Sequence, residues 1–487
     1  MTPEEEDALR AENAALREQV QALLARVQDL EARLAKDSHN SSKPPSSDGL
    51  RRKPKSLREK SGKKRGAQPG HVGHRVSLVA TPDVVEIHRP VQCGACQREL
   101  PADAPRWIKR RQVQELPAVR LQITEHHLVQ VRCPSCGATT AAEAPKGVRA
   151  PQQYGPRLRA IATYLVEQQF VPYARVREFF ADVFGAALSV GTLVNLVRGG
   201  AERLRGVEDE IKARLRQAPV LHHDETGLRV AGAESARLEW THVTCTPELT
   251  HYARHAARGA TALEAIGILP GYQEVSVHDG WTSYRHFQTC RHALCNAHHL
   301  RELTFVEEEL RQEWAGELKR LLREMRTAVK QARAAGAMHL EHVAREDFIA
   351  RYEALLGDGL AHNPQPPPAG PPRRGRRKQS PVRNLLDRLW TYSPVRNLLD
   401  RLWTYEHEAL RFLDDFTVPF DNNQAERDLR MVKVQQKVSG TFCSDAGADA
   451  FCRIRSVCST WRKQGRSILD ALHLAFAGHP LSLQLPS

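Results

Sequence analysis

Hydrophobic residues near the N-terminus recur with a period of seven and predict a long helix. The heptad runs without interruption from residue 6 to residue 34. Leucine fills the d positions, at Leu9, Leu16, Leu23 and Leu30, and the a positions hold Asn13, Val20, Val27 and Leu34. β-Branched a residues, leucine at d and one polar a residue favour a parallel two-stranded coiled coil over a helix packed on its own chain. We therefore expect residues 1–37 to pair two copies of the chain into a homodimer.

The heptad stops in a segment that is almost free of apolar residues. Residues 38–75 are rich in serine, proline, glycine and basic side chains. Such a composition cannot bury a core, which predicts a basic disordered linker. Its lysines and arginines could lie along phosphates through counterion release, or could form only a solvated tether.

Two pairs of cysteines interrupt the next segment, where stretches such as VVEIHRP predict strands. Cys93 and Cys96 form one Cys-x-x-Cys pair, and Cys133 and Cys136 form the other. Four thiolates at this spacing suit a closed tetrahedral Zn²⁺ site; a redox pair or unpaired cysteines are the alternatives. The spacing predicts a zinc-binding domain over residues 76–145, built as a zinc ribbon.

The pattern changes to a helical period over residues 150–207. The stretch PYARVREFFADVFGAALSVGTLVNLVRG holds a helix, a turn centred on glycine, and a second helix for which Ser189 is a suitable N-cap. This arrangement is typical of a helix-turn-helix DNA-binding segment, although ordinary helical hairpins show the same pattern.

Strand patterns dominate residues 215–303 and place two carboxylates. The stretch APVLHHDETGLRV predicts a strand that ends in Asp224, and EVSVHDGW predicts one that ends in Asp279. Between them lie two predicted antiparallel strands and a helix near Thr261. Carboxylates at the ends of neighbouring strands can bind one hard cation. Alternatively, Asp224 caps a turn and Asp279 opens one.

A third acidic residue lies near the C-terminus, in VPFDNNQAERDLR. Glu426 falls at the start of a predicted helix, for which Asn422 and Asn423 are suitable N-caps. Two-metal phosphodiester cleavage needs about three converging carboxylates, two from neighbouring strands and one from a helix packed on the sheet. Asp224, Asp279 and Glu426 together predict a catalytic site for two Mg²⁺ or Mn²⁺ ions, which prefer oxygen ligands.

The segment between the second and third carboxylates is too long for the sheet alone. It predicts a helical insertion over residues 304–413, after which residues 414–487 complete the core with the glutamate-bearing helix and C-terminal helices. The insertion contains a proline-rich basic arm that could contact DNA or act as a solvated spacer.

The same insertion contains an identical tandem repeat, SPVRNLLDRLWTY, at residues 380–392 and 393–405. Only two copies exist and they have not diverged, which indicates a recent duplication or an assembly error rather than a solenoid. Ser-Pro favours a helix start, and proline cannot continue a helix from the preceding copy. We expect the second copy to keep the original place and run on into EHEALRFLDDF, with the first copy as an added hairpin arm.

Charge and composition narrow the class of protein. The chain has 487 residues and a net charge of +14, which favours a polyanionic partner, with nucleic acid ahead of an anionic membrane surface. No stretch is apolar for long enough to span a membrane, and the acidic N-terminus does not resemble a signal peptide. We expect a soluble, cytoplasmic, nucleoid-associated protein.

Several stretches together resemble the transposases of the insertion sequence 66 family. They are HHDETGLRV, VHDGW, LCNAHHLREL and PFDNNQAERDLRMVKVQQKVSGTF, with NSSKPPSSDG, GAQPGHVGH and the two cysteine pairs. The resemblance covers nearly the whole chain. It implies a multidomain α+β transposase in which coiled-coil, zinc-binding and helix-turn-helix segments precede an RNase H-like α/β core. The Asp-Asp-Glu triad of that core falls on Asp224, Asp279 and Glu426.

The resemblance also implies partners and a reaction. The partners are double-stranded DNA, as terminal inverted repeats and as target, with accessory proteins of the same element as further candidates. Metal-activated water would hydrolyse the strand at the element's end, and the freed 3′-hydroxyl would attack target DNA. A dimeric zinc-containing DNA-binding regulator without catalysis, or an inactivated transposase copy, are the alternative functions.

Residues around the glutamate helix complete the candidate site. Arg427 and Arg430 are expected near the phosphates, with Lys433 and Lys437 as further DNA-binding candidates. Cys443, in SGTFCS, stands where the family usually has a basic residue and could weaken a DNA contact.

A Cys-x-x-His pair follows the second aspartate. Cys295 and His298 resemble a signature found at this place in several transposase superfamilies. Two ligands do not complete a zinc site, so we favour a structural or active-site packing role over metal binding.

Overall fold

The computed structural model describes most of the chain from residue 66 onward. The described residues are 12, 13, 16, 17, 20, 27, 66–67, 70–73, 77–101, 109–117, 119–231, 237–364 and 394–483. The predicted coiled coil and basic linker lie almost entirely outside this set, as do the proline-rich arm and the first repeat copy. Leu16, Val20 and Val27 of the heptad are described, and all three are exposed.

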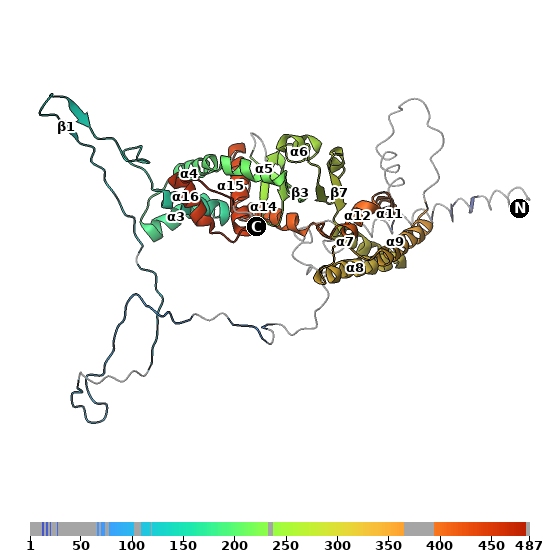
Figure 1. Cartoon of the computed structure of the whole chain (residues 1–487), viewed down its shortest axis with the longest axis horizontal. Coiled ribbons are helices and arrows are strands. Elements are labelled where there is room, and N and C mark those ends of the chain that lie inside the picture. Colours follow the sequence, from blue (N-terminus) through green and yellow to red (C-terminus); the bar gives the residue numbers. More distant parts are fainter. Residues whose placement is uncertain are drawn as a thin grey trace, which may run out of the picture.

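A five-stranded mixed sheet forms the centre of the molecule (Figure 1). Its strands are β3 (Val220–Val230), β4 (Arg237–Cys245), β5 (Thr250–His255), β6 (Val275–His278) and β7 (Arg291–Leu294), in the order β5-β4-β3-β6-β7. The first three strands pair antiparallel, whereas β6 pairs parallel to both β3 and β7. Helix α6 (Ala260–Ile266) precedes β6, and the short 3₁₀ helix η3 (Thr282–His286) follows it.

The sequence prediction of three strands, a helix and a fourth strand is confirmed, because β3, β4, β5, α6 and β6 occur in that order. The fifth strand, β7, was missed. It is only four residues long, too short for an alternating pattern to stand out.

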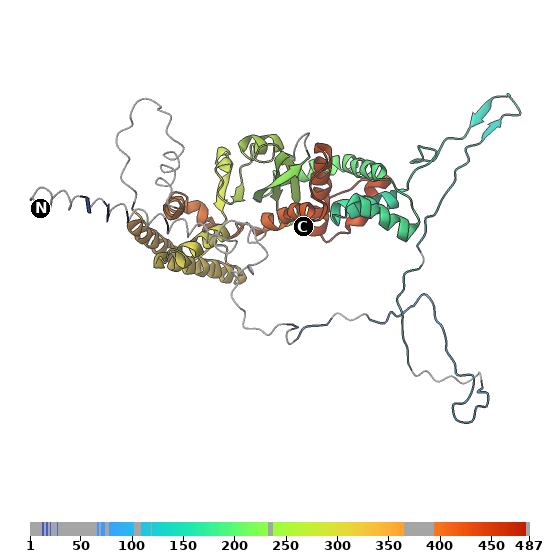
Figure 2. The same cartoon turned by 180° about the vertical axis from the view of Figure 1, so that it is seen from behind.

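Helices that precede β3 and helices that follow the insertion pack together beside the sheet (Figures 1 and 2). The N-terminal set comprises α2 (Pro156–Thr163), the π-helix η2 (Tyr164–Gln168), α3 (Tyr173–Phe184), α4 (Val190–Arg203) and α5 (Arg205–Leu215). The C-terminal set comprises α14 (Asn423–Ser439), α15 (Asp445–Lys463) and α16 (Ile468–Ala477). The two sets share a hydrophobic core, in which Val197 of α4 and Phe476 of α16 are both buried.

The turn between α3 and α4 follows the predicted sequence signals. Gly185 ends α3 in a left-handed conformation, with φ of 63°. Ser189 precedes α4, and its Oγ accepts a hydrogen bond from the backbone N–H of Thr192 at 3.0 Å. Both features confirm the expected helix, turn and N-cap.

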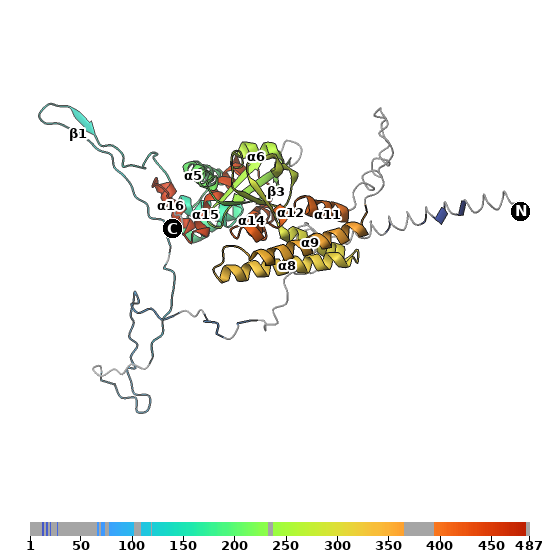
Figure 3. The ribbon, with the colours of Figure 1, turned by 45° about the vertical axis from the view of Figure 1, so that its right-hand side comes forward.

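The insertion between β7 and α14 builds a second hydrophobic core (Figure 3). Its helices are α7 (Asn296–Glu308), α8 (Glu313–Ala334), α9 (His342–His362), α11 (Pro394–Thr404), α12 (Glu406–Ala409) and α13 (Arg411–Asp414). The predicted helical character of this segment is therefore present in its described part.

The second repeat copy packs inside that core. Helix α11 begins at Pro394, and Val395, Leu398, Leu399 and Leu402 are buried against the other helices of the insertion. The chain does not run straight on from this helix, because α11 ends at Thr404 and α12 and α13 follow as separate short helices.

A small hairpin, β1 (Gln130–Arg132) and β2 (Thr139–Ala141), carries the second cysteine pair at its turn. Figures 1 and 2 show it away from the helical and sheet layers. Within the described part of the chain, no helix has the length and apolar character that a membrane span needs.

The repeat offers a matched pair of substitutions. Leu399 is fully buried, so Leu399→Ala should lower the free energy of unfolding by about 2–5 kcal/mol. Leu386 is its counterpart in the first copy, and as part of an added arm its replacement by alanine should change stability by only about 0.5 kcal/mol. Denaturant unfolding measures both. Equal losses for the two variants would contradict the idea that only the second copy belongs to the core.

Candidate active site

Asp224 lies inside β3 rather than at its end. The prediction that the strand ends at Asp224 is wrong, because β3 continues to Val230 through its antiparallel pairing with β4. The parallel pairing with β6, however, covers only Val220 to His222. Beyond His222, β3 no longer pairs with β6. Asp224 therefore still lies where these two strands separate.

Asp279 follows directly on β6 and opens a tight turn. Its Oδ1 accepts a hydrogen bond from the backbone N–H of Trp281 at 2.9 Å, and Gly280 has φ of 90°. The turn expected as an alternative role is therefore present. A carboxylate has two oxygens that together accept about four hydrogen bonds, so this turn leaves acceptor capacity for a ligand.

Glu426 lies in the first turn of α14, where the helix dipole favours a negative charge. Leu429 and Val432 of this helix are buried against Leu228 and Val230 of β3. This packing seats the helix on the sheet and brings its N-terminus toward Asp224.

Asn422 and Asn423 do not cap α14 through their side chains, which corrects the sequence prediction. The buried Asn422 amide instead joins the helix to β3: its Nδ2 donates to the His223 carbonyl at 2.7 Å, and its Oδ1 accepts from His222 Nδ1 at 2.9 Å. The backbone N–H of Asn423 donates to Asp421 Oδ1 at 3.2 Å. The Asp421 side chain, rather than that of either asparagine, therefore binds a backbone N–H at the start of α14.

The charges near Asp224 act on the ionisation of its carboxylate. Burial raises the pKa of Asp224 well above its usual range, and the negative charges of Glu225, Asp279 and Glu426 raise it further. Asp279 and Glu426 are therefore close enough to Asp224 to act on its ionisation. Like charges held together in this way favour binding of a proton or a cation.

Glu225 is an acidic residue that the sequence reasoning missed. Its buried carboxylate accepts a hydrogen bond from Tyr284 Oη at 2.7 Å and pairs with Arg258 at 2.8 Å. The Arg258 guanidinium in turn lies 4.0 Å from the centre of the Trp281 ring. Glu225 already has partners for both oxygens, which makes it a support for the strand rather than an open ligand.

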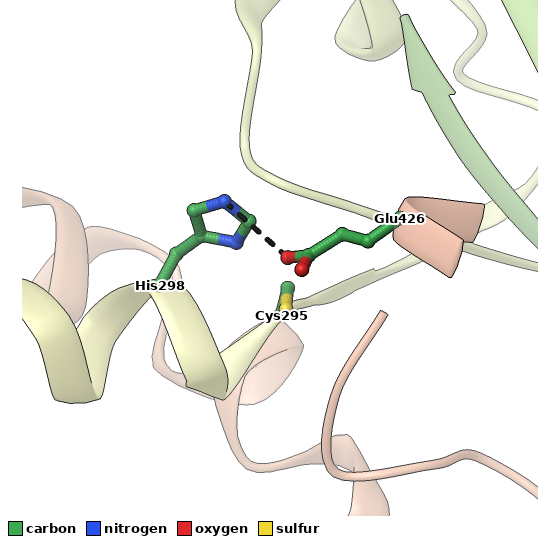
Figure 4. A group of neighbouring side chains, drawn as sticks. All are labelled: Cys295, His298 and Glu426. Atoms are coloured by element: carbon green, nitrogen blue, oxygen red, sulfur yellow. Dashed lines mark ion pairs between the residues drawn. The ribbon is translucent and has the colours of Figure 1, made fainter. Parts of the chain in front are cut away.

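Helix α7 presents three side chains at intervals of three residues. Cys295 directly precedes the helix, and His298 and Arg301 lie on the same face. Arg301 Nη2 lies 3.4 Å from Glu426 Oε2, and His298 Nε2 lies 3.7 Å from Glu426 Oε1. Figure 4 shows Cys295 and His298 turned toward the glutamate.

The Cys295 thiol is poorly suited to nucleophilic chemistry. Burial raises the pKa of Cys295 to about 12, and the nearby Glu426 charge adds to the shift. The thiol is therefore protonated at neutral pH, whereas the thiolate is the nucleophile.

The basic candidates of α14 divide into two groups. Arg427, Arg430 and Lys437 are exposed. Lys433 is half-buried, and its Nζ donates to the Gly227 carbonyl at 2.6 Å. Lys433 therefore fixes the helix to β3, whereas the other three side chains face solvent.

Cys443 is exposed on the segment that follows α14. Its neighbour Phe442 donates its N–H to the Arg229 carbonyl at 3.1 Å and accepts from the Ala231 N–H at 2.7 Å. The segment thus extends the sheet beside the end of β3, with Cys443 at its surface.

The two cysteine knuckles form separately. In each, backbone N–H groups of the tight turn donate to the first sulfur and lower the pKa of that thiol, Cys93 through Cys96 and Cys133 through Cys136. All four residues are described, and no three of these thiols lie within 4.8 Å of one another. The structure therefore shows two separate cysteine pairs rather than a closed set of four thiols.

Comparison with protein-family models identifies a family for the central part of the chain. Residues 151–450 match the model of the family described as "Transposase IS66 family". Residues 1–77 match a second model, described as a family of unknown function (DUF6444). A comparison with curated proteins finds no match.

The carboxylate cluster predicts an unusual pH dependence of stability. The folded state raises the pKa of Asp224, so it stabilises the protonated form. That contribution is present below the unfolded pKa of about 3.9 and is lost as pH rises through the folded value. Without divalent cations at neutral pH, Asp224→Asn should therefore raise Tm by at least about 2 °C.

The gap in Tm should close as the pH is lowered toward 4, because the wild-type side chain then takes up a proton. Thermal unfolding followed by circular dichroism measures the difference in Tm between the wild type and Asp224→Asn at each pH. Asp209→Asn, at an exposed position on α5, is the control and should change little. A lower Tm for Asp224→Asn at neutral pH would contradict the electrostatic account.

Proposed function

The chain belongs to the IS66 family of transposases, and from this premise we propose that Asp224, Asp279 and Glu426 are its catalytic residues. Membership of the family implies an enzyme that binds DNA and cleaves and joins its strands. The proposed reaction is metal-dependent cleavage at the terminal inverted repeats of the element, followed by strand transfer to target DNA.

One observation supports this assignment above the others. Burial raises the pKa of Asp224 on β3, and the charges of Glu225, of Asp279 after β6 and of Glu426 at the start of α14 raise it further. Three carboxylates contributed by two neighbouring strands and a helix are the set that two-metal phosphodiester cleavage needs. The order and pairing of the strands are consistent with the RNase H-like core that we propose around them.

The residues fit the proposed Mg²⁺ or Mn²⁺ ions. Glu426 Oε1 is buried and has no hydrogen-bond partner among the described residues, and an unpaired buried oxygen is costly unless a ligand satisfies it. Asp224, Asp279 and Glu426 would hold the ions through oxygen, the ligand type that Mg²⁺ and Mn²⁺ prefer. When bound, the ions would offset charge at the phosphate and lower the pKa of the attacking hydroxyl.

The protein's own groups orient these ligands. The Glu225 N–H donates to Asp224 Oδ1 at 2.9 Å, and the Trp281 N–H holds Asp279. Arg301 lies beside Glu426 Oε2, whereas the other oxygen, Oε1, makes no hydrogen bond to the described residues. Held side chains of this kind lose little entropy when substrate and ions bind.

Basic side chains supply the path for DNA. We propose that Arg427, Arg430 and Lys437 contact phosphates beside the site, because they are exposed on the helix that carries Glu426. Such contacts position the backbone without reading sequence. Reading of the terminal repeats is assigned to the helix pair α3 and α4 and to the cysteine knuckles.

The remaining assignments concern assembly. Cys93, Cys96, Cys133 and Cys136 are proposed to bind structural Zn²⁺, which would require the two cysteine pairs to come together. The lowered pKa values of Cys93 and Cys133 favour the thiolate form that zinc binds. The heptad is proposed to pair two protomers so that both ends of the element are held together.

The triad is tested by removing one carboxylate at a time. Asp224→Asn, Asp279→Asn and Glu426→Gln should each lower Mn²⁺-dependent nicking of labelled end DNA by at least about 100-fold, because each is a metal ligand. Binding of the same DNA in a gel-shift assay should be retained. Asp209→Asn is the control and should nick normally.

The same assay separates the alternatives. Nicking that persists in any of the three variants would reject that residue as a ligand. Sequence-specific binding by the wild type without any Mn²⁺-dependent nick would favour the DNA-binding regulator or an inactivated copy.

The α14 arginines should affect affinity through charge alone. The double variant Arg427→Ala/Arg430→Ala should reduce the slope of log K against log salt by about 2, because each phosphate contact contributes about 0.9. The slope is measured by fluorescence anisotropy with end DNA. Lys330→Ala/Arg333→Ala, at exposed positions on α8, removes the same charge elsewhere. An equal loss in both double variants would contradict a local contact.

A further inference from the structure

Two residues near Glu426, Cys295 and His298, can bind metals through sulfur and nitrogen. The Cys295 sulfur, a His298 ring nitrogen and a Glu426 carboxylate oxygen all lie within 4.8 Å of one another. Figure 4 shows the three side chains converging from α7 and α14. Sequence reasoning found only the first two, because Glu426 is distant in the chain.

Two of these side chains carry polar atoms without a hydrogen-bond partner, although His298 Nε2 lies 3.7 Å from Glu426 Oε1. Glu426 Oε1 and His298 Nδ1 are both buried and make no hydrogen bond within the described part of the chain. A buried polar atom that is left unsatisfied destabilises the folded state.

The donor set selects a class of ion. Sulfur, nitrogen and oxygen ligands suit Zn²⁺ and related transition ions, whereas Mg²⁺ and Mn²⁺ prefer oxygen alone. Three protein ligands with one open position is a familiar zinc arrangement. Tetrahedral zinc would hold these ligand atoms about 3.4–3.6 Å apart, so modest side-chain movement from the present separations would suffice.

The surroundings favour a bound thiolate. The backbone N–H of Asn422 donates to Cys295 Sγ at 3.1 Å, which supplies a hydrogen bond to the sulfur that a metal would bind. One thiolate, one carboxylate and one divalent ion sum to zero charge, while Arg301 remains paired with Glu426 Oε2. The ion and its two anionic ligands would therefore be neutral together, and replacement of the thiol proton by the ion raises the local charge by one unit.

We propose that Cys295, His298 and Glu426 bind one zinc-class ion, and that this ion withholds Glu426 from the catalytic Mg²⁺ or Mn²⁺ ions. On binding, the Cys295 thiol releases its proton to solvent and its sulfur becomes a ligand. Because Glu426 serves both sites, the two kinds of ion compete for it. The inhibitory consequence rests on the proposed function, whereas binding of the ion does not.

Binding is tested on the full-length protein with Co²⁺ alone. Co²⁺ bound to thiolate gives a near-ultraviolet charge-transfer band. Part of this band will come from Co²⁺ bound to Cys93, Cys96, Cys133 and Cys136. Cys295→Ser should bind one equivalent of Co²⁺ fewer than the wild type and lose part of the band. Cys443→Ser, which removes an exposed thiol, should titrate as the wild type does. His298→Gln should weaken the same equivalent by at least about 10-fold while keeping every thiol.

Inhibition is tested separately, by adding Zn²⁺ to the nicking assay with end DNA at a fixed Mg²⁺ concentration. The wild type should be inhibited, and Cys295→Ser and His298→Gln should need at least about 10-fold more Zn²⁺ for the same inhibition. Identical Co²⁺ titrations of the wild type, Cys295→Ser and His298→Gln would overturn the site. If the wild type shows no nicking at all, the proposed function fails while the Co²⁺ result still decides the binding.

Discussion

The attachment of Asn422 to β3 is the interaction on which the arrangement of the site depends. Glu426 is contributed by a helix that follows a large insertion, so its position relative to the strand carboxylates must be fixed by tertiary contacts. The Asn422 side chain bonds to His222 and to the His223 carbonyl, and its N–H bonds to Cys295. One buried residue thereby joins β3, the start of α7 and the start of α14, with Asp224 next to its anchor on the strand. A buried amide whose hydrogen bonds are satisfied is costly to displace.

The insertion can vary in length because the chain is fixed again before α14 begins. The Asn296 side chain donates to the Ala409 carbonyl at 2.7 Å, and the Asn296 N–H donates to the Phe420 carbonyl at 3.1 Å. Arg411 also donates to the His292 carbonyl at 2.7 Å. These bonds link the segment between α12 and α14 to β7 and α7 of the core. Thirteen additional residues upstream therefore need not displace Glu426, provided that α11 keeps its place among the insertion helices.

Local sequence patterns predicted most helices and strands, whereas tertiary contacts determine where β3 ends and which partners individual side chains bind. Strands β3 to β6, α6, the Ser189 cap and the start of the second repeat copy at Pro394 follow from short-range signals that the structure reproduces. The extension of β3 beyond Asp224 depends on pairing with β4, which no local signal in β3 reveals. Asn422 and Lys433 looked like a cap and a phosphate ligand, but each bonds to a backbone carbonyl of β3. The roles of Asp224, Asp279 and Glu426 stay predictions, although the charges of Asp279 and Glu426 contribute to the raised pKa of the buried Asp224.

Glu426 has more potential partners than its two oxygens can serve at once. Arg301 lies beside Oε2, His298 lies beside Oε1, and Cys295 completes a group on the same side. Asp224 and Asp279 lie near enough for mutual repulsion to favour a shared cation. In a chain of net charge +14 the long-range field attracts DNA, but it falls off within a Debye length of about 10 Å. The ion bound at Glu426 would instead be selected by the few groups in contact with it. Oxygen ligands alone favour Mg²⁺ or Mn²⁺, whereas added sulfur and nitrogen ligands favour Zn²⁺. On the two proposals made above, the glutamate would belong either to a magnesium site or to a zinc-class site, and occupation of one would exclude the other.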